Sequence, residues 1–140
     1  MILLDTNVLS ELLKPSPSPK VLDWISAQPR ASLFTSAIVR AEILYGIRLL
    51  PEGRRKAGLE DATRAIFRNE FVGRVLSFDS DAADAYAEIG AVRRSAGRPI
   101  SQLDAMIAGI ARSRGAVLAT RNVKDFEACG IAVVDPWAAG

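Results

Sequence analysis

Three acidic residues lie in otherwise apolar stretches, and they are the side chains best suited to catalysis. Asp5 ends the first hydrophobic run, Glu42 is flanked by Ala41 and residues 43–45, and Asp104 lies in the apolar segment 103–108. A carboxylate removed from water is costly unless a cation or hydrogen-bond donors meet it. The chain has no histidine, which excludes Ser-His-Asp catalysis and zinc bound by histidine. We therefore expect carboxylate chemistry assisted by a cation that prefers oxygen ligands.

Each of these acids also has a structural explanation. Asp5 could cap a helix that starts directly after it, a common role for aspartate. Asp104 lies three residues after Ser101, which is the spacing of a capping box. Glu42 could be a surface residue, but it lies about 200° around its helix from Arg40, on the apolar side. This geometry favours function for Glu42 and leaves both alternatives open for Asp5 and Asp104.

Hydrophobic periodicity predicts alternating strands and helices along the whole chain. The expected strands are residues 1–4, 31–35, 74–78, 117–120 and 131–134. The expected helices are residues 6–14, 21–29, 37–50, 52–70, 80–95 and 101–114. Strands joined through helices need right-handed crossovers, which make the sheet parallel and cover both of its faces.

The predicted architecture is a three-layer α/β fold in one domain of residues 1–140, with a central, mostly parallel sheet of about five strands flanked by helices. The carboxyl ends of such strands form one edge of the sheet, where ligands bind. Asp5 and the turn at residues 120–122 belong to this edge.

Composition limits the other classes of function. No apolar stretch approaches the about 18–20 residues needed to cross a bilayer, and no signal peptide precedes the first strand. Cys129 is the single cysteine, which excludes an internal disulfide and favours a reducing cytoplasm. A catalytic role for its thiol is disfavoured because the chain offers no histidine base.

The basic residues are compatible with a nucleic-acid partner. Lysine and arginine total 18 against 16 acidic residues, and arginine, the main basic residue here, binds phosphate bidentately. One basic segment runs from Arg54 to Arg68, and a second contains Arg93, Arg94 and Arg98. Each segment is either a nucleic-acid surface or a solvated helix face, and solvated faces are more common.

Four motifs occur in a specific order: Ile2-Leu3-Leu4-Asp5-Thr6-Asn7, Ala41-Glu42-Ile43, Leu103-Asp104-Ala105-Met106-Ile107-Ala108, and Leu118-Ala119-Thr120-Arg121-Asn122-Val123-Lys124-Asp125-Phe126. In this order they resemble the PIN-domain ribonucleases, with the VapC and FitB toxins of bacterial type II toxin–antitoxin pairs as near neighbours. The resemblance spans nearly the whole chain, down to residues 134–137. It implies a central parallel sheet between helices, metal-dependent endonucleolytic cleavage of RNA, a homodimer, and a cognate antitoxin that blocks the site.

The resemblance also implies roles for particular residues. Asp5 and Asp104 match the family's Mg²⁺ ligands, for which Mn²⁺ is the expected substitute, and Glu42 matches its third acid. The fourth acidic position falls on Asn122, which is a departure from the pattern. An amide oxygen can coordinate a metal or orient a water, but it brings no charge and cannot act as a base. Asp125 would either compensate for this loss or cap a short segment at residues 125–129.

Three nearby polar residues have two interpretations. Thr6, Asn7 and Thr120 could hold the acids through hydrogen bonds, but helix-capping and turn roles are the more common explanation for such residues.

Other readings of the first motif fit less well. A haloacid-dehalogenase-like phosphatase requires Asp-x-Asp, but the third position here is Asn7. A receiver-like domain requires a pair of acids in the first loop and a lysine after a late strand, and neither is clear. The more serious alternative is a catalytically weakened PIN-like module that binds RNA or a protein partner, because Asn122 replaces an acid.

Overall fold

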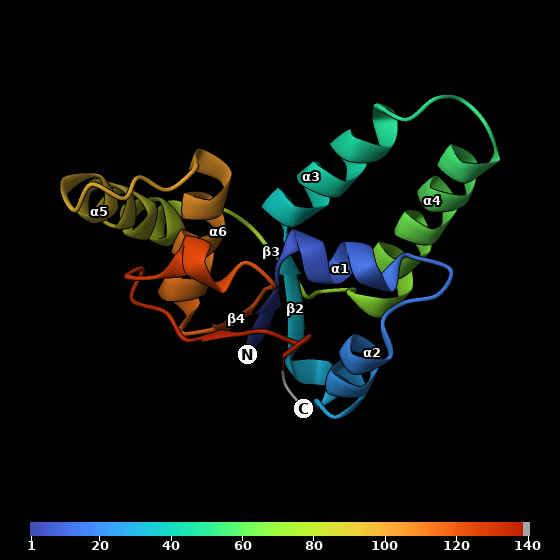
Figure 1. Ribbon diagram of the computed structural model, residues 1–140, viewed down its shortest axis with the longest axis horizontal. Coiled ribbons are helices and arrows are strands. Elements are labelled where there is room, and N and C mark those ends of the chain that lie inside the picture. Colours follow the sequence, from blue (N-terminus) through green and yellow to red (C-terminus); the bar gives the residue numbers. More distant parts are fainter. Residues whose placement is uncertain (139–140) are drawn as a thin grey trace.

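The computed structural model describes residues 1–138, and within them five parallel strands form one central sheet (Figure 1). The strands are β1 (Ile2–Leu4), β2 (Leu33–Ser36), β3 (Val75–Leu76), β4 (Val117–Ala119) and β5 (Val133–Val134). Their spatial order is β3-β2-β1-β4-β5, and every neighbouring pair is parallel. The chain moves outward from β1 in both directions, so the order reverses between β1 and β4. This switch point is where open α/β sheets bind ligands.

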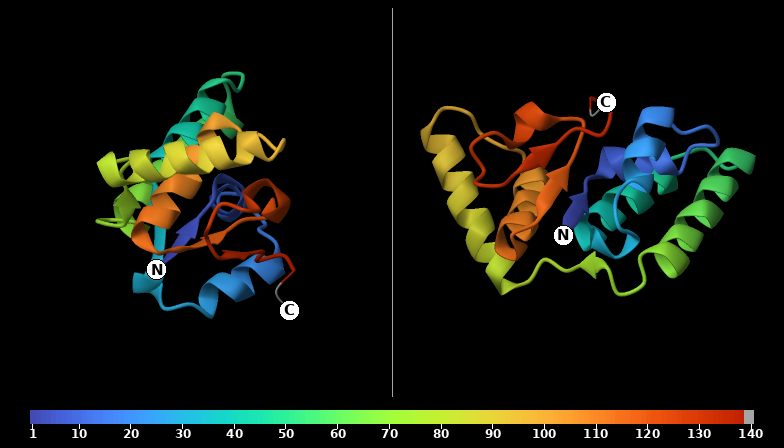
Figure 2. Two further views of the ribbon diagram at one scale, coloured as in Figure 1. Left: turned by 90° about the vertical axis from the view of Figure 1, so that its left-hand side faces the viewer. Right: turned by 90° about the horizontal axis from the view of Figure 1, so that it is seen from below.

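Helices connect the strands: α1 (Thr6–Leu12), α2 (Pro19–Ser26), α3 (Ala37–Arg48), α4 (Arg54–Ala65), α5 (Ser80–Ser95) and α6 (Gln102–Arg114). Helices α5 and α6 pack together on one side of the sheet, and α1 and α2 lie on the other (Figures 1 and 2). Helices α3 and α4 form a pair that extends beyond the carboxyl edge of the sheet (Figure 1). The predicted three-layer α/β fold is confirmed.

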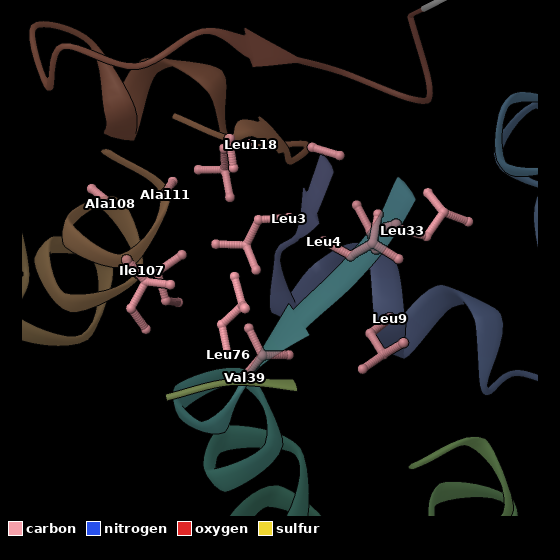
Figure 3. Close-up of a cluster of buried hydrophobic side chains, with 14 of the residues drawn as sticks. Leu3, Leu4, Leu9, Leu33, Val39, Leu76, Ile107, Ala108, Ala111 and Leu118 are labelled. Atoms are coloured by element: carbon pink, nitrogen blue, oxygen red, sulfur yellow. The ribbon is translucent and has the colours of Figure 1, made fainter. Parts of the chain in front are cut away.

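The core is continuous across both faces of the sheet. Leu3 and Leu4 in β1, Leu118 in β4 and Ile107 in α6 are fully buried, and Figure 3 shows this cluster. Strands covered on both faces by helices require such uninterrupted apolar runs. Gly109 lets α6 approach α5, because a Cβ at this position would lie 2.7 Å from the carbonyl oxygen of Ala82.

The observed elements differ from the predicted ones mainly at their ends. The second strand starts at Leu33 because residues Arg30–Ser32 form a short 3-10 turn, η1. The charged helix predicted at 52–70 consists of α4 followed by a π-helical turn, η2 (Ile66–Glu70). A further 3-10 turn, η3 (Val123–Phe126), contains Asp125, so of the two alternatives for this residue the capping of a segment at 125–129 is wrong. Among residues 1–138, no helix combines the length and apolar content needed to cross a bilayer.

Candidate functional site

Asp5 lies at the end of β1, beside the switch point, and its carboxylate is almost completely enclosed. Only 4% of the residue is exposed. Oδ1 accepts a hydrogen bond from the Thr6 amide (2.8 Å), and Oδ2 accepts one from Thr120 Oγ1 (2.8 Å). The first bond makes Asp5 the N-cap of α1. The capping role is therefore confirmed, and Oδ2 is bonded to the turn that follows β4.

Burial raises the pKa of Asp5 from its ordinary 3.8 to about 6. The hydrogen bonds from Thr120 and Thr6 lower this pKa, whereas the carboxylates of Asp104 and Glu42 raise it further. The three acids predicted from the sequence are therefore close enough in space to repel one another. A divalent cation would relieve this repulsion.

Glu42 reaches the same region from α3, whose start is fixed by Ser36. The Ser36 hydroxyl accepts a hydrogen bond from the Val39 amide (3.1 Å) and caps the helix. One turn later Glu42 is half-buried, and its Oε1 accepts a hydrogen bond from Thr6 Oγ1 (2.9 Å). Burial and then the Asp104 carboxylate raise the pKa of Glu42, against the hydrogen bond from Thr6. The inward position expected for Glu42 is confirmed.

Asp104 lies in the first turn of α6 and is half-buried. Its amide donates to the Ser101 hydroxyl (3.3 Å), which caps the helix. Burial raises the pKa of Asp104, the Ser101 hydroxyl and the Arg93 guanidinium lower it, and the Asp125 carboxylate raises it. Helix capping is thus local to Ser101, while the carboxylate of Asp104 shares the electrostatic environment of Asp5 and Glu42.

Thr120 is the hub of the hydrogen bonds around Asp5. Its hydroxyl is fully buried, donates to Asp5, and accepts from Asn7 Nδ2 (3.2 Å) and the Asn122 amide (3.1 Å). Asn7 Oδ1 in turn accepts from the Arg121 amide (3.1 Å). This network ties the turn after β4 to the turn after β1. The sequence analysis favoured capping and turn roles for Thr6, Asn7 and Thr120. All three donate to the acids, with Asn7 Nδ2 3.5 Å from Asp5 Oδ2, and Thr120 also has the turn role through the Asn122 backbone amide.

The donor set fits a hard cation in its chemistry. Carboxylate, hydroxyl and amide oxygens surround the switch point, and these are the ligands that Mg²⁺ prefers. Among residues 1–138, no three acidic or cysteine side chains are arranged so that they could hold one metal ion together. Magnesium commonly uses only one or two carboxylates and completes its shell with water and phosphate oxygens. Asp5 and Asp104 meet that smaller requirement in number and kind.

The two basic segments have separate environments. Arg64 of α4 and Arg68 of η2 line a groove opposite Arg40 and Arg48 of α3. This groove opens on the side of α3 away from Glu42, because Arg40 lies about 200° around the helix from it. In the second segment Arg93 is buried, so the expectation of a solvated face is wrong for that residue.

Comparisons with known proteins agree with this architecture. The PIN domain family matches residues 2–130 of the chain. The plasmid stability protein StbB of Pseudomonas syringae pv. tomato is 45% identical over 99% of this chain and 100% of its own length. VapC ribonuclease Y4jK of Sinorhizobium fredii is 40% identical over 98% of both chains.

The toxin FitB of Neisseria gonorrhoeae is 37% identical over 98% of this chain and 99% of its own length. The crystal structure of FitAcB from the same organism covers 99% of both chains with a TM-score of 0.91. The order of the four motifs, the five-stranded parallel sheet and these similarities all lead to the same family. The chain belongs to the PIN domain family, in the group that contains the VapC and FitB proteins.

Proposed function

We propose that this chain, as a single domain of residues 1–140, is a magnesium-dependent endoribonuclease and the toxin of a type II toxin–antitoxin pair. Membership of the PIN domain family and relatives named VapC ribonuclease and toxin FitB, matched over nearly their full lengths, support the proposal. The observation that carries it is the enclosed Asp5 carboxylate at the switch point, whose pKa is raised by burial and by two further carboxylates. Such a site favours a cation and a polyanionic substrate together.

Asp5 and Asp104 are the proposed metal ligands, with Mg²⁺ as the ion and Mn²⁺ as its substitute. The bound cation would neutralise charge on the scissile phosphate and lower the pKa of the attacking water. Glu42 positions that water and accepts its proton. Glu42 is half-buried, and the hydrogen bond from Thr6 Oγ1 fixes its Oε1, which supports this role. Its raised pKa also makes it a better base near neutral pH.

Asn122 completes the proposed catalytic set without adding charge. Its backbone amide donates a hydrogen bond to Thr120 Oγ1, and η3 begins directly after Asn122. The side-chain amide can orient a water or a phosphate but cannot take a proton. Proton transfer in the proposed reaction therefore rests on Glu42 alone, and a second metal is not required.

The proposed partners are RNA, a second copy of the chain and an antitoxin. The antitoxin would inhibit by covering the acids. For the homodimer, Tyr45 on α3 and Leu49 directly after that helix are the favoured contacts, because each is 67% exposed. Trp24 and Trp137 are partly buried, and Trp137 is covered by Arg121, whose guanidinium carbon lies 4.8 Å from the ring centroid. A cytoplasmic location follows from this proposal, and no membrane partner is proposed.

The test is cleavage of a labelled RNA by the purified chain with Mg²⁺, with Mn²⁺ and with EDTA. We expect cleavage with either metal and none with the chelator. Asp104→Asn should abolish cleavage, whereas Asp84→Asn, the same change at an exposed position on α5, should leave it unchanged. Cleavage that survives Asp104→Asn or EDTA would refute the assignment.

Expression in a bacterial host distinguishes the enzyme from the binding module. An active toxin should arrest growth in a way that Asp104→Asn relieves. Growth arrest that persists in this variant would instead support a PIN-like module that acts by binding.

A further inference from the structure

Arg93 is buried, although it lies in a run of basic residues near the end of α5. It is 5% exposed, whereas its neighbour Val92 is 52% exposed and Arg94 is also exposed. Arg93 lies four residues after the buried Ile89, which places both side chains on the inner face of the helix. The spacing from Ile89 was the one sequence signal for this burial, and the adjacent arginine concealed it.

The guanidinium of Arg93 joins two segments that are distant in sequence. Nε donates to the carbonyl oxygen of Arg98 (2.7 Å), in the connection between α5 and α6. Nη1 donates to the carbonyl oxygens of Asp125 and Glu127 (2.9 Å each), in the segment that follows β4. One side chain thus fixes the backbone on both sides of Phe126, together with the turn that leads into α6.

Both segments continue directly into the proposed site. The Asp125 amide donates to the Asn122 carbonyl (3.0 Å), and the Asn122 amide donates to Thr120 Oγ1, the hydroxyl that holds Asp5. In the other direction, Arg98 lies three residues before the helix cap that precedes Asp104. Arg93 therefore connects the turn that carries Asn122 to the helix that carries Asp104.

The bonding of Arg93 is unusual for a buried cation. Within residues 1–138, no carboxylate lies within ion-pair distance of it, and its hydrogen bonds go to three neutral carbonyls and to Cys129 Sγ (3.6 Å). Removing the side chain would take the partner from three partly buried carbonyls at once, which is more costly than losing a fully exposed contact. The Arg98–Glu127 ion pair links the same two segments, but both of its side chains are about half exposed, so it holds them only weakly.

We infer that Arg93 is a positioning residue that sets the placement of the Asn122 turn relative to the Asp104 helix. The inference rests on the proposed function, since it concerns the geometry of that site. Arg93 does not touch the substrate, because it is enclosed by backbone. Its loss should therefore reduce turnover and magnesium affinity while leaving RNA binding intact.

The test compares Arg93→Met with Ile89→Ala, a core substitution one turn earlier on the same helix that controls for lost stability. At a temperature where both are folded, Arg93→Met should lower kcat by about 10–100-fold, the usual effect of losing a residue that orients metal ligands. It should raise the magnesium concentration for half-maximal activity and leave KM for RNA unchanged. Ile89→Ala, and Arg94→Met at the exposed neighbour, should keep the wild-type kcat. If Arg93→Met does not fold, Arg93→Lys, which retains the charge, replaces it in the comparison with Ile89→Ala.

A second readout needs neither metal nor RNA. Amide hydrogen exchange at residues 122–129 should be faster in Arg93→Met than in Ile89→Ala. Equal exchange in these two variants, or an equal loss of kcat, would show that Arg93 contributes only stability and would overturn the inference. A wild-type chain that cleaves no RNA would refute the proposed function instead, and hydrogen exchange would still decide whether Arg93 holds the two segments.

Discussion

The acid that follows the first strand and the two acids on helices are held in different ways. Asp5 follows a central strand, is 4% exposed, and accepts hydrogen bonds from Thr6 and Thr120, which come from two separate turns. Glu42 and Asp104 are half-buried; the Glu42 carboxylate accepts one hydrogen bond, from Thr6 Oγ1, and the Ser101 hydroxyl beside Asp104 is bonded by the backbone amide of that residue. Asp5, at the strand end, is therefore the most firmly held of the three acids, and Glu42 and Asp104 on the helices are freer to move.

The first prediction removes the charge at each kind of position. Asp5→Asn should reduce RNA cleavage to the level without enzyme, because the best-fixed proposed metal ligand is lost. Glu42→Gln should lower kcat by about 100-fold, within the range for a general base. Steady-state cleavage at saturating Mg²⁺ measures both effects. A larger loss of kcat for Glu42→Gln than for Asp5→Asn would mean that the acid on the helix matters more for cleavage than the acid after the strand.

The second prediction removes the hydroxyls that hold the acids. Thr120→Val should lower kcat by about 10–100-fold, as for other residues that orient ligands. Thr6→Val should cost less than about 10-fold, because Glu42 remains half in water. Thr120→Ser keeps the hydroxyl and is the matched control. Equal losses of kcat in Thr120→Val and Thr6→Val would contradict the view that Asp5 is held more firmly than Glu42.

The third prediction concerns stability against pH. The pKa of Asp5 is raised in the folded chain, so the folded state binds more protons than the unfolded state between pH 3.8 and about 6. This carboxyl therefore destabilises the metal-free fold as pH rises through that window, by about 3 kcal/mol at neutral pH. Glu42 and Asp104 act in the same direction.

Thermal unfolding with and without Mg²⁺ measures this effect. Relative to Asp5→Asn, the Tm of the metal-free wild type should fall between pH 4 and pH 6.5 and then level off. Added Mg²⁺ should raise the Tm more at pH 7.5 than at pH 5. A Tm difference from Asp5→Asn that stays constant with pH would contradict the raised pKa.

The smallest expected effect is that of Asp125→Asn. The Asp125 carboxylate raises the pKa of Asp104, so its removal should move the acidic limb of the cleavage profile to lower pH. At pH 7 cleavage should change by less than about twofold, because burial raises the pKa of Asp104 more than the Asp125 carboxylate does. A loss above about tenfold would mean that Asp125 supplies the charge that Asn122 lacks.

Local signals predicted the helices and strands well. Ser36, Asp79 and Ser101 cap α3, α5 and α6, as their positions before apolar periodic segments indicate. Gly115 ends α6 in the left-handed conformation, with φ of 63°. The parallel sheet followed from the same alternation, because the connections are long enough only for crossovers.

The contacts that shape the site were beyond such signals. The Thr6–Glu42 bond spans 36 positions and the Thr120–Asp5 bond spans 115, so no local period contains them. The four motifs contain Thr6, Asn7 and Thr120, but the sequence could not decide whether these residues hold the acids or only cap helices and turns. Arg93 shows the same limit, since its burial depends on carbonyls more than 30 positions away.

One carboxylate both opens α1 and forms the centre of the proposed site, which affects how an inactive protein should be prepared. Alanine at position 5 would silence the chain but would also cost about 0.5–2 kcal/mol by uncapping the helix. Asparagine accepts the same bond from the Thr6 amide and so removes the charge while keeping the helix start. A harmless, well-folded sample for isolating bound RNA or an inhibitor complex should therefore carry asparagine at this position.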